Sequence, residues 1–300
     1  MTAPIVALLG TGKMGAALVD RWHEAGREVV VWNRTASSAE ALRRDGVRVA
    51  ATAADAAREA DIVVVSLTDG TALCAVLIAQ GTVAAMRPDA VLVDLSTVDV
   101  PASAEVALEA QRHGIPYLRG AVSGSPGVMR SGAASLLLSG PQAAYDAARP
   151  VLDELTTTQV LVGDAEQARV VKLAVNSMLG ATMQILAEAV TLAEASGVTR
   201  ERFLDAVDAS VMHSRFVAYK GAALRARDYT ATFTTADMRK DVLLALGQAS
   251  SVGVIMPVAD LVLDRLDAAC ASGFAASDFL ALQCVEQQAS GRVADLEQEA

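Results

Sequence analysis

The segment Ile5–Ala25, with the sequence IVALLGTGKMGAALVDRWHEA, decides the fold of this chain. It begins with five consecutive apolar residues, a pattern typical of a parallel strand that is buried on both faces of a sheet. The glycines that follow have the spacing G-x-G-x-x-G, and a helical pattern of apolar residues starts directly after them. A strand, a glycine turn and a helix in this order predict a dinucleotide-binding site.

The three glycines of this turn have separate physical roles in such a site. Gly10 permits the tight turn, Gly12 lets the backbone approach a pyrophosphate, and Gly15 lets the helix pack closely against the strand. The phosphates are expected at the helix N-terminus, where backbone N–H groups point outward. The alternative is a glycine-rich turn that holds no ligand. We assign the complete turn to cofactor binding: Gly10, Thr11, Gly12, Lys13, Met14 and Gly15.

The end of the second predicted strand indicates which dinucleotide binds. Sites for NAD carry an acidic residue about 20 residues after the glycines, where it contacts the ribose 2′-hydroxyl. This chain has Asn33, Arg34 and Thr35 there, with no carboxylate to repel a 2′-phosphate. Arg34 can hold that phosphate through a forked, charge-assisted contact, with Asn33 and Thr35 as further donors. The sequence therefore predicts NADP. The alternative is that Arg34 is an exposed turn residue and that NAD is also accepted.

Short apolar runs alternate with helical patterns through the first half of the chain, which predicts an α/β Rossmann domain with a doubly wound, mainly parallel sheet. Two of the intervening helices are predicted at 12–25 and 37–45. The predicted strands are Ile5–Leu9, Val29–Trp32, Asp61–Ser66, Ala90–Leu95, Pro116–Leu118 and Ser135–Ser139, the last as an antiparallel addition.

The strand pattern stops after about Gly163, and residues 167–196 form one long apolar helical pattern that Gly197 closes. We expect an NADP-binding Rossmann domain at 1–163, a long interdomain helix at 164–196, and an all-α domain for substrate binding and dimerisation at 197–300. The helices predicted beyond Gly197 are 201–210, 213–226, 235–252, 257–271 and 276–288.

Composition excludes several classes of protein. The net charge of −10 and the acidic balance argue against nucleic acid or an anionic membrane as a partner. No run of 18 apolar residues, no signal-peptide pattern and only three widely spaced cysteines predict a cytoplasmic protein with reduced thiols. Three distant histidines predict no metal site. A long helix that is apolar almost all round needs cover, so we expect a homodimer or homotetramer.

Five further segments complete a pattern that spans roughly residues 4–290. In this order, together with the glycine turn, they resemble the β-hydroxyacid dehydrogenase family, which includes 3-hydroxyisobutyrate dehydrogenases and glyoxylate or succinic semialdehyde reductases. The segments are Asn33-Arg34-Thr35, Asp94-Leu95-Ser96-Thr97-Val98, Val122-Ser123-Gly124 with Arg130-Ser131-Gly132 after it, Lys172-Leu173-Ala174-Val175-Asn176, and Lys240-Asp241.

The resemblance implies roles for residues that match the family motifs. Lys172 is expected to donate or accept the proton, and Asn176, four residues further on one helix face, to orient it or the substrate hydroxyl. Apolar neighbours on every side of Lys172 argue against a plain surface lysine. Ser123 and Gly124 are expected to hold a substrate carboxylate. The remaining residues expected at the cofactor are Leu67, Thr97 and Lys240; a helix-surface ion pair with an aspartate is the alternative for Lys240.

The substrate loop departs from the family pattern. The family sequence D-A-P-V-S-G-G is replaced at Arg119–Ser125 by RGAVSGS, which keeps Ser123 and Gly124 but changes the residues around them. The family also often has an asparagine where this chain has Val175. These departures leave the fold unaffected but put the standard small hydroxyacid substrate in question.

The sequence therefore predicts an NADP-dependent enzyme that interconverts a small β-hydroxyacid and its aldehyde or keto acid, with a carboxylate-bearing small molecule as substrate. Imine reductases are near relatives that share Asn-Arg-Thr at 33–35, but they usually carry aspartate or tyrosine in place of Lys172. A third alternative is an NADP-binding protein without activity. Such relatives have lost the lysine that this chain retains.

Overall fold

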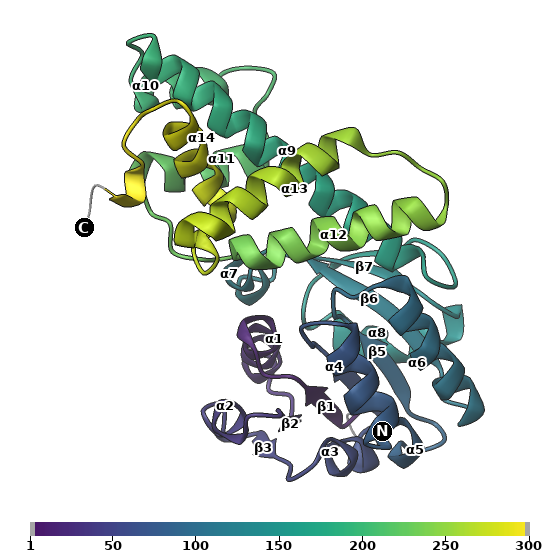
Figure 1. The fold of residues 1–300 in the computed structure, drawn as a ribbon. Helices are drawn as coiled ribbons and strands as arrows, with labels where there is room; N and C mark the ends of the chain where they lie inside the picture. The colour runs from purple at the N-terminus through teal and green to yellow at the C-terminus, as the bar shows by residue number, and fades with distance from the viewer. Residues whose placement is uncertain (1–3, 298–300) are drawn as a thin grey trace. The chain divides into compact units, whose positions relative to one another are not determined.

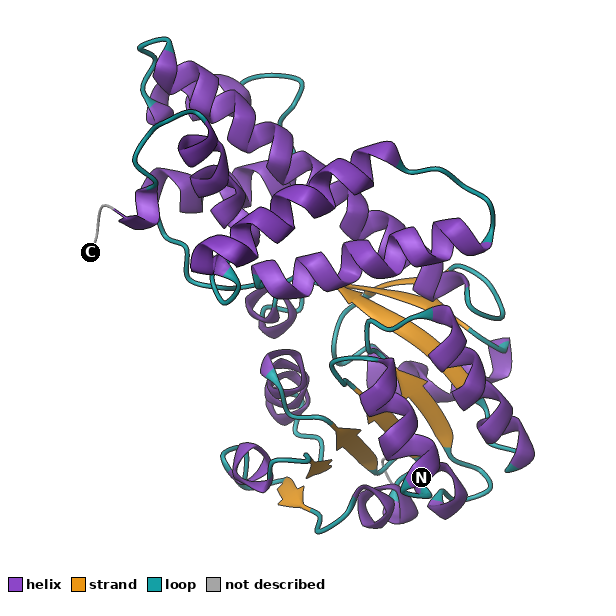
Figure 2. Ribbon diagram, in the orientation of Figure 1, coloured by secondary structure: helices purple, strands orange, loops and turns teal. Residues whose placement is uncertain are grey.

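The computed structural model of the chain describes residues 4–297 (Figure 1). The chain divides into two compact units, residues 1–172 and 173–300, and the boundary lies inside the long helix α9, Gln167–Ala195. The first unit is an α/β domain and the second is helical (Figure 2). The predicted fold class is thereby confirmed. Residues 1–3 and 298–300, at the ends of the predicted domains, lie outside the described residues.

The first unit contains one eight-stranded sheet with the order β3-β2-β1-β4-β5-β6-β7-β8. Neighbouring strands are parallel except β6 and β7, which are antiparallel as expected for Ser135–Ser139. The strands are β1 (Val6–Leu9), β2 (Val29–Trp32), β3 (Val47–Val49), β4 (Ile62–Val65), β5 (Val91–Asp94), β6 (Tyr117–Ser123), β7 (Ser135–Ser139) and β8 (Thr158–Leu161).

The strand order reverses between β1 and β4, and this reversal places a ligand site. In open α/β sheets, ligands bind outside the carboxyl ends of the strands at such a point. Leu9 pairs with Val65 on one side and with Trp32 on the other, so β1 lies between β4 and β2. All four residues of β1 are fully buried, which explains the uninterrupted apolar run in the sequence.

Helices cover both faces of the sheet, and each face has its own apolar core. Leu8 packs with residues of α1, α2, α7 and α8, whereas Leu9 packs with residues of α3, α4, α5 and α6. The bounds are α1 (Lys13–Glu24), α2 (Ala36–Glu40), α3 (Ala53–Glu59), α4 (Gly70–Cys74), α5 (Thr82–Ala85), α6 (Val100–Arg112), α7 (Pro126–Arg130) and α8 (Gln142–Leu152).

The second unit forms a third apolar core, in which Met183 and Val190 of α9 pack with residues of the later helices. The prediction of a helix over 276–288 is wrong at its start, because Asp278 caps a short 3₁₀ turn, Phe279–Ala281, that precedes α14. The predicted helix 37–45 likewise ends early, at Glu40. The helices are α10 (Arg200–Asp208), α11 (Arg215–Ala226), α12 (Thr235–Ser251), α13 (Pro257–Ala269) and α14 (Leu282–Ala289).

Helix α9 is, by length and composition, apolar enough to cross a membrane. Its polar residues identify it as a core helix instead. Arg169, Asn176, Gln184 and Thr191 recur along it at intervals of seven or eight, and each is buried. Gln184 donates to Glu286 at 2.8 Å, and Thr191 accepts from Gln283 at 2.9 Å. These hydrogen bonds satisfy buried polar side chains of α9 through α14, as expected of a helix that packs in a protein core.

Candidate active site

The glycine turn between β1 and α1 shows which glycines the fold itself requires. Gly10 has φ +104°, and a Cβ there would lie 2.2 Å from the carbonyl oxygen of Ser66. A Cβ at Gly15 would lie 2.0 Å from the carbonyl oxygen of Gly10. At Gly12 the backbone is ordinary, φ −68° and ψ −171°, and a Cβ would meet no atom within 4 Å. The chain's own packing therefore explains Gly10 and Gly15, whereas the open space at Gly12 fits the approach of a ligand.

The N-terminus of α1 has the properties of an anion site. Gly12 is the N-cap and supplies no side-chain hydrogen bond, and the first turn of α1 carries no acidic residue. The neighbouring Thr11 hydroxyl is buried and has no hydrogen-bond partner among residues 4–297. N–H groups at a helix N-terminus attract phosphate through hydrogen bonds and the helix dipole. The pyrophosphate of a dinucleotide fits these residues.

The segment after β2 combines a brace with an exposed cation. The Asn33 side chain accepts a hydrogen bond from the Thr11 backbone at 3.1 Å and donates to the Thr35 carbonyl at 3.1 Å. Its amide therefore braces the glycine turn, a role that the sequence did not predict. Arg34 is exposed, and its guanidinium has no ion-pair or hydrogen-bond partner in the described part of the chain. A guanidinium in this state is open to a phosphate.

The carboxyl ends of β4 and β5 are joined by a side-chain contact. The backbone of Leu67 donates to the Ser96 hydroxyl at 2.9 Å, and the Ser96 backbone donates to the Asp94 carboxylate at 2.9 Å. Thr97 follows and is half-buried. Leu67 and Thr97, both predicted at the cofactor, thus lie on segments that are fixed to each other at one edge of the sheet.

The substrate loop follows β6 directly. Ser123 is the last residue of β6, and Gly124 has φ +144°, a conformation that other residues rarely adopt. Ser125, where the family has glycine, caps α7 by accepting a hydrogen bond from Val128. Ser123 and Gly124 are therefore placed at a strand end by a helix cap.

Arg119, which replaces the aspartate of the family pattern, has interaction partners of its own. Its guanidinium pairs with Glu166 at 2.6 Å and lies 4.6 Å from the centre of the Tyr117 ring. Its positive charge is thus compensated within the first unit. We infer that Arg119 changes the frame of the loop and adds no uncompensated cation to it.

A buried ionic network lies behind the loop, and the sequence did not predict it. Arg169 of α9 donates to the Asp94 carboxylate at 2.5 Å, to the Ser96 carbonyl at 2.6 Å and to the Gly120 carbonyl at 2.7 Å. Arg169 is 1% exposed and Asp94 is fully buried. The only sequence signal was a single arginine within an apolar helix, a pattern shared by many surface residues.

Lys172 lies one turn beyond Arg169 on α9. It is half-buried, and its Nζ donates to the Val122 carbonyl at 2.9 Å. Val122 is next to Ser123, so the ammonium is held at the start of the predicted substrate loop. The predicted lysine and the predicted carboxylate-binding loop are therefore brought together within the first unit.

Two of the predicted site residues, Asn176 and Lys240, belong to the second unit, whereas Lys13 and Met14 lie in the first turn of α1 in the first unit. Asn176 is buried and donates from Nδ2 to the Asp241 carboxylate at 2.5 Å. Its Oδ1 has no hydrogen-bond partner among the described residues. Lys240 pairs with the neighbouring Asp241 at 3.1 Å, which is the alternative contact that the sequence left open. Because the Asp241 carboxylate accepts from Nδ2, Asn176 presents its oxygen as an acceptor.

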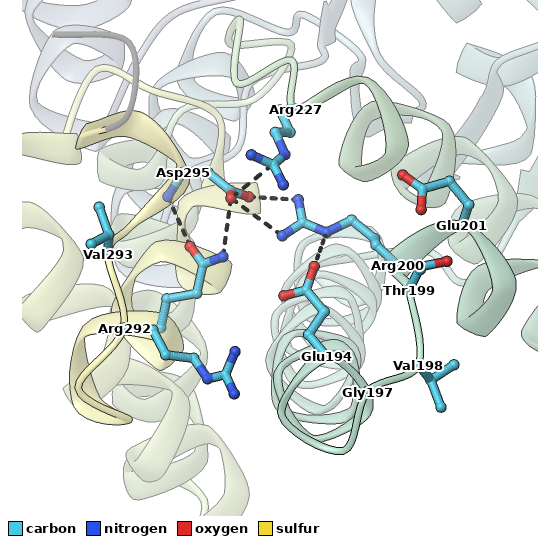
Figure 3. Close-up of a pocket in the computed structure, with 11 residues that line it drawn as sticks. Glu194, Gly197, Val198, Thr199, Arg200, Glu201, Arg227, Arg292, Val293 and Asp295 are labelled. Atoms are coloured by element: carbon cyan, nitrogen blue, oxygen red, sulfur yellow. Dashed lines mark hydrogen bonds and ion pairs between the residues drawn. The ribbon is translucent and has the colours of Figure 1, made fainter.

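Two cavities among the described residues lie away from these side chains. One, of about 610 Å³, belongs to the second unit, where Arg200 is paired with Glu194 and Asp295 (Figure 3). The other, of about 340 Å³, lies in the first unit beside Gly140 and Gly163. Neither is lined by a predicted site residue. The candidate site therefore rests on the sheet edge and its loops.

Comparison with known proteins identifies the class of the fold. Residues 5–163 match the family described as the NAD-binding domain of 6-phosphogluconate dehydrogenase. Residues 167–285 match the family described as NAD-binding of NADP-dependent 3-hydroxyisobutyrate dehydrogenase. The chain belongs to this family of NAD(P)-dependent dehydrogenases. The predicted resemblance, enzyme class and cofactor class are confirmed.

Three relatives show how far the similarity extends. Glyoxylate/succinic semialdehyde reductase 1 of Arabidopsis thaliana is 28% identical, over 92% of this chain and 96% of its own length. The 3-hydroxyisobutyrate dehydrogenase of Mycobacterium tuberculosis, solved with L-serine, is 27% identical, with a TM-score of 0.84 over 94% of this chain and 98% of that one. An imine reductase of Myxococcus stipitatus, solved with NADP+, is 25% identical, with a TM-score of 0.64 over 93% of this chain and 98% of that one.

The glycine turn generates a paired prediction. Gly12→Ala should leave the melting temperature unchanged, because its Cβ enters open space, but should weaken NADPH binding by at least about tenfold, since a methyl group would lie between backbone and phosphate. Gly15→Ala should lower stability by about 1–3 kcal/mol or more through overpacking. Thermal unfolding and NADPH fluorescence titration measure both. Unchanged NADPH affinity in Gly12→Ala would contradict the assignment of this turn to the pyrophosphate.

Proposed function

We propose that this chain is an NADP-dependent enzyme that interconverts a small β-hydroxyacid and the corresponding aldehyde or keto acid. The observation that carries the proposal is the hydrogen bond from Lys172 to the carbonyl of Val122. It holds a proton-carrying side chain beside Ser123 and Gly124, on a Rossmann domain whose glycine turn fits a dinucleotide. The names of the two reductase and dehydrogenase relatives support the same reaction class.

The chemistry asks for one proton transfer and one bound carboxylate. The nicotinamide cofactor supplies the hydride chemistry when it is bound. Lys172, as an ammonium, would donate its proton to the substrate carbonyl oxygen in reduction and take it back as an amine in oxidation. Asn176, one turn further along α9, would accept a hydrogen bond through its Oδ1, from the substrate hydroxyl or from the Lys172 ammonium.

The substrate carboxylate would bind at the end of β6. A serine hydroxyl and backbone N–H groups beside a glycine with positive φ form a concave anion-binding arrangement. Ser123, at the end of β6, and Gly124, with φ +144°, would provide those groups here. The neighbouring Arg119 is neutralised by Glu166, so the carboxylate depends on the loop itself. This favours a small monocarboxylate that carries its aldehyde or keto group within reach of Lys172.

The preference for NADP over NAD rests on Arg34. It is exposed, has no partner in the described residues, and stands where NAD-binding chains carry an acid. Leu67 and Thr97 at the strand ends, and Lys240 through the family resemblance, are proposed as further cofactor contacts. An imine reductase is less well supported, since Lys172 replaces the aspartate or tyrosine usual in that group.

We propose in addition that the enzyme is cytoplasmic and assembles as a homodimer or homotetramer. Met178, Ile185 and Leu192 lie seven residues apart on one stripe of α9, and they are 68%, 57% and 68% exposed. Such a stripe of large apolar side chains on one helix is expected to be covered by another protein surface.

The lysine mechanism predicts a selective loss of activity in Lys172→Ala. NADPH oxidation should be followed with glyoxylate, succinic semialdehyde, methylmalonate semialdehyde, tartronate semialdehyde and one cyclic imine. A carboxylate-bearing aldehyde should be the best substrate, and kcat should fall by about 10²–10⁴-fold in the variant, because the positioned proton donor is lost. NADPH fluorescence titration is the control and should show unchanged affinity. Wild-type turnover in Lys172→Ala, or turnover of the imine alone, would contradict the proposal.

The cofactor assignment predicts that Arg34→Ala discriminates between NADPH and NADH. Loss of a charge-assisted hydrogen bond of about 1.5–3 kcal/mol should raise the KM for NADPH by about 10–100-fold and leave that for NADH unchanged. Arg43→Ala is the matched control, because Arg43 is an exposed arginine close by that pairs with Glu40. An equal effect of Arg34→Ala on both cofactors would refute the 2′-phosphate contact.

The apolar stripe predicts that Ile185→Glu yields a smaller species. A charge in the middle of a buried apolar interface is unfavourable, whereas a charge on an exposed helix face changes little. Sedimentation velocity should show a dimer or tetramer for the wild type and a shift toward monomer for the variant. Glu188→Gln, one turn away on α9, is the control. A monomeric wild type, or an unchanged variant assembly, would exclude this stripe as the interface.

A further inference from the structure

We propose that Arg169 is a positioning residue, which holds Lys172 and the two loops of the site in fixed relation to one another. The inference rests on the proposed function in one respect, namely that Lys172 carries the proton. It concerns residues of the first unit alone. None of the family motifs found in this chain includes Arg169.

The contacts of Arg169 join α9 to segments that lie far from it in the sequence, namely β5 with the loop after it, α6 and β6. Its two terminal nitrogens bond the carboxylate of Asp94 at the end of β5, the carbonyl of Ser96 in the loop after it, and the carbonyl of Gly120 in β6. Its Nε donates to the hydroxyl of Ser103 in α6 at 3.3 Å. The loop that leads to Thr97 and the strand that leads to Ser123 are therefore tied to one guanidinium.

Lys172 is aligned by the same arrangement. Arg169 and Lys172 are three residues apart, so they share a face of α9. Their acceptors, the carbonyls of Gly120 and Val122, are two residues apart on β6 and therefore point in the same direction. Two cationic side chains on successive turns thus bond alternate carbonyls of one strand. A shift of α9 along β6 would break both bonds together.

Only an arginine can make this set of contacts. The guanidinium has five donors in a rigid fork, whereas a lysine ammonium is a single point on a flexible stem. Lysine at 169 could pair with Asp94, but it could not bond Ser96 and Gly120 at the same time. The substitution therefore keeps the buried charge and removes the brace.

Arg169 and Tyr117, two donors of the network, keep their protons at the pH of the assay. Burial by itself would lower the pKa of Arg169, but the Asp94 charge and the Tyr117 hydroxyl raise it above the ordinary arginine value. Burial, and then Asp94, raise the pKa of Tyr117 well above that of an exposed tyrosine. Tyr117 therefore stays protonated and donates to Asp94 at 3.0 Å.

The test is a double-mutant cycle of Arg169→Lys with Lys172→Ala in the full-length enzyme, measured with the best aldehyde of the substrate panel. In the wild-type background, Arg169→Lys should lower kcat by about 10–100-fold, the usual effect of misplacing a reacting group. The KM for NADPH should change by less than about threefold. In the Lys172→Ala background it should lower kcat much less, because the lysine that it positions is gone and only the two loops remain to be held. Equal losses in both backgrounds, or no loss in either, would overturn the proposal.

Arg200→Lys is the matched structural control. Arg200 is also buried, at 3% exposed, and pairs with the fully buried Asp295 in the second unit, but it contacts no predicted site residue. It should lower the melting temperature to a similar extent and leave kcat within about twofold of the wild type. A kcat loss in Arg200→Lys equal to that in Arg169→Lys would show that general destabilisation explains both.

A milder variant keeps the test decisive if Arg169→Lys does not fold. Tyr117→Phe removes one hydroxyl from the network and leaves the ion pair in place. It should lower kcat about threefold or more in the wild-type background and clearly less in Lys172→Ala. If Lys172→Ala is as fast as the wild type, the proposed function itself fails. If Lys172→Ala is slow and Tyr117→Phe acts equally in both backgrounds, only the positioning role fails.

Discussion

The buried ion pair between Arg169 and Asp94 is the interaction on which the arrangement of the candidate site depends. Each ion costs several kcal/mol to remove from water, and the pair is tolerated only where the remaining donors and acceptors are also satisfied. Backbone carbonyls of Ser96 and Gly120 satisfy the guanidinium, and the backbone of Ser96 satisfies the second carboxylate oxygen. Removing one partner would leave an unpaired buried charge, at a cost of about 3–5 kcal/mol. The sheet edge and the first turns of α9 therefore behave as one piece.

The opposite side of the site depends on steric limits and not on charge. Gly10 and Gly15 are required because backbone oxygens occupy the space that a side chain would need. That close packing brings the N-terminus of α1 to the carboxyl ends of β1 and β4, where the strand order reverses. Of the three glycines in the turn, Gly12 alone lacks such a reason within the chain. The candidate site thus combines a closely packed glycine turn, which would bind the phosphates, with the Arg169–Asp94 ion pair, which holds the helix segment that contains Lys172.

The sequence predicted the parts of the fold that have strong local patterns. The buried central strands appear as uninterrupted apolar runs, and the glycine turn and Lys172 belong to short motifs. β3 and β8 were missed because they are short and partly exposed, with polar residues such as Arg48 and Gln159 inside them. The network of Arg169 could not be predicted, because its acceptors, two backbone carbonyls and three side chains, come from segments that only the fold brings together. The brace role of Asn33 was missed for the same reason.

Hydrogen–deuterium exchange of the wild type and Arg169→Lys tests the central claim most directly. If Arg169 holds the two loops, exchange should accelerate selectively in peptides that cover 94–98 and 119–124. Peptides from β1 and α1, which contain no contact of Arg169, should exchange as in the wild type. An equal acceleration across the whole first unit, or unchanged exchange in both loops, would contradict the account, because the brace would then be either a general support or no support at all.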